Sequence, residues 1–86
     1  MQSRKELKVI ILDSGIEIEE VENVKIIRIK SDNYSLLILK DYWPVVGEIN
    51  GSISIEGERN IRYDNINGFY SLSRNLFYLI IKDKGE

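Results

Sequence analysis

The sequence predicts an all-β fold, an antiparallel β-sandwich or flattened barrel of about nine to ten short strands. Isoleucine, valine and tyrosine recur in runs of about five to eight residues, a length and composition typical of strands. Most runs are followed directly by Gly, Asn, Asp or Ser, and no segment keeps a helical spacing of apolar residues for long. With 86 residues, the chain is expected to form a single domain, residues 1–86, around one core.

The strand-like runs follow one another along the chain, separated by short polar segments. They are residues 7–12, 16–21, 24–30, 34–39, 45–49, 52–56, 61–66, 69–72 and 76–81. Asn50-Gly51 and Asn67-Gly68 each predict a two-residue hairpin, because Asn-Gly accepts the positive φ angles of a type I′ turn. Further polar turn clusters are residues 13–15, 31–33, 57–60 and 73–75. We therefore expect an antiparallel meander with almost no crossovers.

The alternation of residues indicates which strand faces are buried. Ile53 and Ile55 share one face of their strand, while serines and a glutamate take the other, so one side is expected to be covered and one wet. The run 36–39, Leu-Leu-Ile-Leu, has no polar face. Such a strand either lies between two layers or turns its second face towards a partner.

The absence of two residue types limits the chemistry. Without cysteine there is no disulfide or thiolate, and without histidine the commonest general base and transition-metal ligand is missing. No metal, cofactor or catalytic residue is therefore expected. A net charge of -2 provides no positive field for a phosphate backbone, which argues against nucleic-acid binding. The apolar run 9–12 is too short for a signal peptide or a membrane span, so a cytosolic location is expected.

Two clusters of residues are candidate functional sites. The first is a cluster of acidic residues, which are Glu17, Glu19, Glu20 and Glu22. Such residues favour a solvated strand face over a carboxylate enzyme or a cation site. A carboxylate enzyme would use Glu17, Glu19 or Asp41 as its catalytic residues. A nucleic-acid-binding barrel would need aromatic platforms interleaved with basic residues. The residues that mix these types, which are otherwise expected to fill the core, are Arg59, Arg62, Tyr63, Phe69, Tyr70, Arg74, Phe77 and Tyr78.

The segment Lys40-Asp41-Tyr42-Trp43-Pro44 holds the only tryptophan and the only proline. Proline fixes φ and donates no backbone hydrogen bond, so a strand must end here and the loop is expected to be stiff. Tyr42 and Trp43 either plug the core under this loop or anchor a partner, since aromatic residues on rigid loops are favoured at interfaces. Both interpretations stay open.

From this segment outward, the chain resembles the N-terminal domain of the epsilon subunit of F-type ATP synthases. Residues 21–24, Val-Glu-Asn-Val, resemble the family's Val-Glu-Ser-Val, and residues 37–45 lie where the family has Gly-Ile-Leu-Pro-Gly-His-Ala-Pro-Leu. Residues 66–72 fall on Ser-Gly-Gly-Phe-Leu-Glu-Val, and residues 79–83 on the closing strand. The order and spacing agree over nearly the whole chain. Lys40-Asp41-Tyr42 replaces the family's Pro-Gly-His, so only the location of that loop is carried over.

The resemblance implies a non-catalytic subunit of the central stalk. It would link the gamma subunit to the membrane c-ring during rotary ATP synthesis and ion transport, as a peripheral part of the complex at the cytoplasmic face of the cell membrane. The family's C-terminal helical hairpin would begin where this sequence ends, so autoinhibition is not expected here. By position, the residues implied to face the c-ring are Ser35, Lys40, Asp41, Tyr42 and Trp43. The alternative is a standalone sandwich or barrel interaction module, including a nucleic-acid-binding one.

Overall fold

A computed structural model describes residues 6–84 of the chain, and these residues form six β-strands and no helix. The prediction of an all-β fold is confirmed. In this part of the chain there is accordingly no helix that could cross a membrane. The strands are β1 (Leu7–Asp13), β2 (Ile16–Ser31), β3 (Ser35–Ile38), β4 (Val45–Gly57), β5 (Ile61–Ser73) and β6 (Leu76–Lys84).

The strand count differs from prediction because three pairs of predicted runs merge into long strands. β2, β4 and β5 each continue through a polar break in the pattern. The predicted hairpins at Asn50-Gly51 and Asn67-Gly68 are wrong: both pairs lie inside strands, and Asn50 pairs with Asn67 across the sheet. None of these four residues has a positive φ.

Close backbone approach explains the two glycines inside the strands. A Cβ on Gly51 would lie 2.1 Å from the Lys30 carbonyl oxygen, and one on Gly68 would lie 2.1 Å from that of Ile80. Both glycines also adjoin a register shift in the β4–β5 or β5–β6 pairing. The two Asn-Gly pairs, which predict turns from the local sequence, therefore lie at two places where a strand bends and its backbone packs closely against a neighbouring strand.

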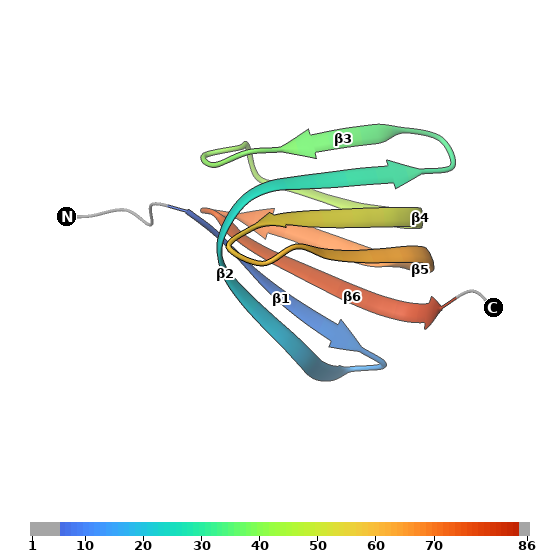
Figure 1. Ribbon diagram of the computed structural model, residues 1–86. Helices are drawn as coiled ribbons and strands as arrows, with labels where there is room; N and C mark the ends of the chain where they lie inside the picture. The colour runs from blue at the N-terminus through green and yellow to red at the C-terminus, as the bar shows by residue number, and fades with distance from the viewer. Residues whose placement is uncertain (1–5, 85–86) are drawn as a thin grey trace.

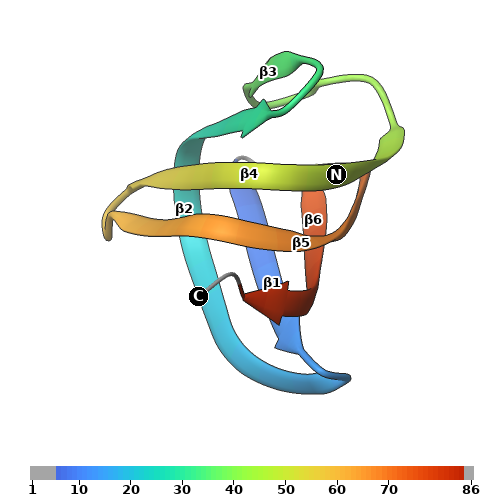
Figure 2. The ribbon, with the colours of Figure 1, turned by 90° about the vertical axis from the view of Figure 1, so that its right-hand side faces the viewer.

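The predicted meander is also wrong, because the sheet closes on itself. The order is β1-β6-β5-β4-β2-β3, with an additional pairing of β1 to β2. β2 is long enough to serve both layers: its first half pairs with β1, and its second half lies between β3 and β4 (Figure 1). β1 and β6 then meet in parallel. Figure 2 shows β4 and β5 running across the direction of β1 and β6, as in a flattened barrel.

Four predicted turn clusters are confirmed as the connections between strands. In the β1–β2 hairpin, Ser14 and Gly15 have φ of 55° and 83°, and in the β5–β6 hairpin, Arg74 and Asn75 have φ of 52° and 63°. Positive φ at both central residues is the geometry of a type I′ turn. The type I′ hairpins therefore exist, but at turns other than the two Asn-Gly pairs.

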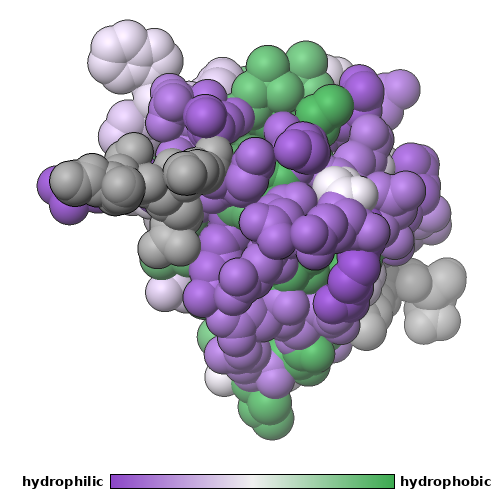
Figure 3. Space-filling model, turned by 60° about the vertical axis from the view of Figure 1, so that its left-hand side comes forward, coloured by the Kyte–Doolittle hydropathy of each residue, from purple (hydrophilic) through white to green (hydrophobic). Residues whose placement is uncertain are grey.

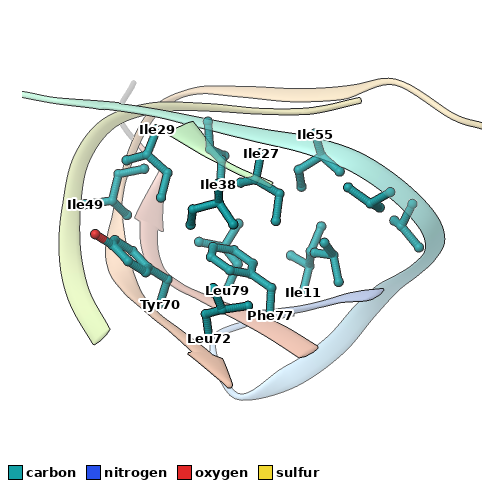
Figure 4. Close-up of a cluster of buried hydrophobic side chains, with 14 of the residues drawn as sticks. Ile11, Ile27, Ile29, Ile38, Ile49, Ile55, Tyr70, Leu72, Phe77 and Leu79 are labelled. Carbon is teal, nitrogen blue, oxygen red and sulfur yellow. The ribbon is translucent and has the colours of Figure 1, made fainter. Parts of the chain in front are cut away.

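The core lies between the two layers and consists mainly of isoleucine. Figure 4 shows side chains from β1, β2, β3 and β4 meeting those of β5 and β6. Ile53 and Ile55 are buried as the alternation predicts. Tyr70 and Phe77 stack in the core with their ring centroids 5.7 Å apart. Most core positions alternate with exposed ones, which confirms that the strands are covered on one side.

The outward faces of the two layers differ in character. On the face formed by β2, β4 and β5, the outward side chains are polar, and they are Arg28, Lys30, Ser52, Ser54, Glu56, Arg62 and Asp64. We call this the polar face. Its ion pairs join Arg28 to Glu56 and Arg62 to Asp64, each at 3.0 Å. The outward face over β1, β6 and β5 instead exposes apolar side chains, among them Phe69, Tyr78 and Ile80.

Candidate functional site

The segment predicted to meet a partner connects β3 to β4 at one end of the barrel (Figure 1). Lys40, Asp41 and Trp43 are exposed there, and Tyr42 is half-buried. Ser35 is also exposed, but it begins β3 and pairs with Lys30 at the other end of that strand. The fold thus brings four of the five predicted residues together in one loop and places Ser35 apart from them.

Two hydrogen bonds clamp this loop to the β5–β6 hairpin. The Asp41 backbone N–H donates to Asn75 Oδ1 at 2.6 Å, and Asn75 Nδ2 donates to Asp41 Oδ1 at 3.0 Å. Asn75 is 5% exposed, and its backbone carbonyl accepts a hydrogen bond from the Lys8 N–H at 2.9 Å. Because Asn75 is tied to β1 as well as to the loop, the clamp connects the loop to the body of the barrel.

The backbone within the loop makes a tight turn. The Tyr42 N–H donates to the Leu39 carbonyl at 3.2 Å, and Asp41 has a φ of 64°. Asp is one of the few residues that tolerate this left-handed conformation, because its short side chain can hydrogen-bond locally. Pro44 then fixes φ before β4 begins at Val45. The prediction of a stiff loop agrees with these constraints.

The sequence left open whether the two aromatic residues of the loop pack into the core or anchor a partner, and the structure gives a different answer for each. Tyr42 packs against the core as a partly buried side chain, whereas the Trp43 side chain is 82% exposed. A tryptophan is among the most costly side chains to leave in water, and it is enriched at the centres of protein interfaces. Trp43 is therefore the stronger candidate anchor, and Tyr42 is the aromatic residue of the loop that packs against the core.

Two leucines add exposed apolar surface in β3 and where the chain leaves it towards the same loop. Leu37 points outward from β3, Leu39 follows the strand, and each is 47% exposed. We call Leu37, Leu39 and Trp43 the loop patch. In Figure 3, the top of the molecule, where β3 lies in Figure 1, exposes apolar atoms (green) next to hydrophilic surface. The apolar run 36–39 is thus an edge strand with Ile38 buried and its second face exposed, which fits one of the two predicted environments.

The acidic cluster does not converge into a site. Glu20 and Glu22 pair with Lys8 at 2.7 and 3.8 Å, and Glu19 pairs with Arg59. The hydrogen bond and charge of Lys8 lower the pKa of Glu20 below its usual value. Within residues 6–84, no three acidic side chains are grouped so that they could hold a metal ion. Three of the four glutamates are thus ion-paired, and the cluster is a solvated part of β2.

The aromatic and basic residues weighed for nucleic-acid binding are divided between core and surface. Tyr70 and Phe77 are buried, while Phe69 and Tyr78 are 39% and 38% exposed on the apolar outward face. Lys82 lies over the Phe69 ring, 5.2 Å from its centroid. The mixture that the sequence presented as one set therefore does not form one surface.

A polar hollow of about 480 Å³ is lined by the β2–β3 turn, by β4 and by Tyr70. Tyr34 Oη donates to the Glu48 carbonyl, so the 2.8 Å contact between the two hydroxyls is donated by Tyr70. Burial raises the pKa of the Tyr70 hydroxyl, and its hydrogen bond to Tyr34 raises it further. A Cβ on Gly47 would lie 2.6 Å from Tyr70 Oη, so glycine leaves the space that this tyrosine occupies. The hydroxyls brace the turn against β4.

Sequence reasoning missed Asn75, the residue that fixes the loop. It appeared only as a member of a turn cluster, and nothing near it in the sequence points to Asp41, which is 34 positions away. Trp43 and the leucines of the loop patch, in contrast, carry a visible signal, because they are large apolar residues beside a proline and in a run without a polar face.

The fold and the loop define a small closed β-sandwich with a rigid, apolar loop at one end. No protein-family model and no curated protein matches the sequence. The structure is similar to a chain in the cryo-EM structure of the central stalk and c-ring of Tetrahymena thermophila mitochondrial ATP synthase, with a TM-score of 0.72 and 13% identity. That similarity covers 95% of this chain and 67% of the other.

A second similar structure comes from the same kind of assembly. It is a chain in the cryo-EM structure of Euglena gracilis mitochondrial ATP synthase, which contains OSCP, F1 and the c-ring in rotational state 1. The TM-score is 0.81 with 16% identity, and the similarity covers 96% of this chain and 54% of the other. This chain therefore spans about two thirds of the first neighbour and about half of the second. At such low identity, the likeness establishes the fold.

Proposed function

We propose that this chain is a non-catalytic subunit of the central stalk of an ATP synthase, linking the gamma subunit to the c-ring in rotary ATP synthesis and proton or other ion transport. The observation that carries the proposal is the near-complete fold match, over 95% and 96% of the chain, to chains from two ATP synthase assemblies. The order and spacing of its motifs, which resemble the epsilon subunit, support the same role. Its partners would be the gamma subunit and the c-ring, without nucleic acid.

The loop patch would be the surface that meets the c-ring. Support comes from the exposure of Trp43 and from the clamp that fixes its loop, because a pre-ordered anchor loses little conformational entropy on binding. Lys40 and Asp41 lie beside it as exposed polar neighbours. The proposal assigns Ser35 a lesser part, because it lies at the far end of β3. Association with the membrane, at its cytoplasmic face, would occur through the complex alone.

A native co-purification from the cells that express the chain tests this function. A tagged chain is expected to recover the gamma subunit and the c-ring in mild detergent. The variants Trp43→Ser and Leu37→Asp should lower c-ring recovery about tenfold, a loss typical of an interface anchor. Ile16→Ser is the matched control, because Ile16 is 68% exposed and lies in the β1–β2 hairpin away from the loop.

The result that opposes the proposal is equally definite. If the unaltered tagged chain is recovered without any ATP synthase subunit, the chain acts as a standalone interaction module. If it is recovered with the complex but the Trp43 and Leu37 variants behave like Ile16→Ser, the stalk role stands and the assignment of the loop patch is wrong.

A further inference from the structure

A second set of apolar side chains lies on the outward face of the other layer, and it has six members where the loop patch has three. The register places Leu12, Ile80 and Phe69 side by side on β1, β6 and β5. A second row, next to the first, contains Ile10, Tyr78 and, beyond Ser71, Val46 of β4. We call the six apolar members of these rows the outer apolar strip.

The exposure of the strip is unusual for an outward sheet face. Val46 is 74% exposed, and Phe69, Tyr78 and Ile80 are each between 37% and 39% exposed, while Ile10 and Leu12 are half-buried. Outward positions in the polar face carry serines and ion-paired charges instead. Because the two outward faces belong to the same barrel and differ so strongly, the strip is a candidate for a docking surface.

Acidic residues mark both ends of the strip. In the first row, Leu12 pairs with Glu17 of β2, and Phe69 pairs with Glu48 of β4, so the order across the sheet is Glu17, Leu12, Ile80, Phe69, Glu48. In the second row, Ile10 pairs with Glu20. Among the side chains that the structure describes, those of residues 6–82, none forms an ion pair with Glu17 or Glu48.

These dimensions and charges select one kind of partner. From β2 to β4 the rows cross four strand spacings, or about 19 Å, which a helix of about 12 residues spans. We propose that the outer apolar strip binds an amphipathic helix of a partner protein whose apolar stripe ends in Lys or Arg on both sides. The apolar stripe would cover the strip, and the terminal cations would meet Glu17 and Glu48. This docking proposal adds a binding surface to the proposed stalk role. It rests on that role only for the identity of the partner as a rotor protein.

Lys82 lies near one end of the first row. Its ammonium is 5.2 Å from the centroid of the exposed Phe69 ring, and Phe69 is the apolar residue that pairs with Glu48. The chain's own cation is therefore closer to the Glu48 end of the row than to the Glu17 end.

The test uses nuclear magnetic resonance on the full chain with two helical model peptides of roughly fourteen residues, about 21 Å long. Both carry the same leucine stripe, and one has Lys at its ends while the other has Glu. We expect the Lys peptide to bind at least tenfold more tightly and to shift amide signals of β1, β5 and β6. The double variant Glu17→Lys with Glu48→Lys should weaken that binding about tenfold. Glu58→Lys, an exposed control in the β4–β5 turn, should not.

Several outcomes would overturn the proposal. These are equal binding of the two peptides, no binding, shifts confined to the loop patch, or concentration-dependent shifts of the strip without peptide, which would make a second copy of the chain the occupant. The stalk role fails separately, in the co-purification of the unaltered chain. A further variant is Ile80→Glu, whose folding is checked by circular dichroism. If this variant still recovers the gamma subunit fully, the outer apolar strip is not the binding site for the gamma subunit, while the stalk role is unaffected.

Discussion

The substitution Asn75→Ala probes the clamp that presents Trp43. It removes both hydrogen bonds to Asp41 and places a residue with a Cβ, but without a hydrogen-bonding side chain, at a φ of 63°. Two net hydrogen bonds contribute about 1 kcal/mol each, and the left-handed conformation costs alanine about another 1 kcal/mol. The free energy of unfolding should therefore fall by about 3 kcal/mol, which for a domain of this size lowers Tm by about 15 °C.

The glycine variant separates the two causes. Asn75→Gly loses the same hydrogen bonds but adopts the positive φ without strain, so its free energy of unfolding should fall by only about 2 kcal/mol. Urea titration followed by far-ultraviolet circular dichroism measures both variants. Trp43, as the only tryptophan, reports on the loop itself, and its fluorescence anisotropy should decrease in both variants as the loop is released.

A different result would refute this reasoning. If Asn75→Ala costs less than about 0.5 kcal/mol, the range of an ordinary surface substitution, and leaves the Trp43 anisotropy unchanged, the clamp does not hold the loop. Equal losses in the alanine and glycine variants would show that backbone strain at position 75 contributes nothing.

Three further predictions follow from contacts elsewhere in the barrel. Gly51→Ala should lower the free energy of unfolding by more than about 3 kcal/mol, because its Cβ would clash with the backbone. Gly15→Ala should lower it by about 1 kcal/mol, because Gly15 has open space around it and only its φ of 83° is unfavourable for alanine. Urea titration of both variants measures the difference. Because the pKa of Tyr70 is raised in the folded state, stability should fall as pH rises above about 10, where unfolded tyrosine ionises. Tyr70→Phe should reduce that alkaline loss, and unchanged pH dependence would contradict the assignment. Trp43→Ser should change the free energy of unfolding by less than about 0.5 kcal/mol, because the Trp43 side chain is exposed. Thermal unfolding measures this change, and a larger loss of stability would show that Trp43 packs in the core.

The sequence predicts the class of fold because period-two alternation is a local property. Ile53 and Ile55 are buried, and Ser52 and Ser54 lie on the opposite side of the same strand, as their order in the chain requires. The hairpin predictions at Asn50-Gly51 and Asn67-Gly68 are wrong because Asn-Gly is also suited to close packing, and only the neighbouring strand decides which use applies. Lys30 and Ile80, which enforce those glycines, lie far away in sequence.

The same distinction applies to the topology and the candidate site. Closure of the sheet depends on β2 reaching both layers and on the parallel pairing of β1 with β6, which no local pattern signals. Trp43 can be singled out from its neighbours in the sequence, but its exposure depends on the turn that buries Tyr42 instead. Asn75 shows the limit most clearly, since its role consists entirely of contacts made across the fold.

The proposed place of this chain in the rotor of an ATP synthase is tested most directly by a cryo-EM structure of the ATP synthase purified through a tag on this chain from the cells that express it. We expect density for the sandwich at the foot of the central stalk, with Trp43 towards the c-ring and the outer apolar strip covered by a helix. A tagged chain that recovers no ATP synthase, or a recovered enzyme whose position at the foot of the central stalk is occupied by another protein, would contradict it.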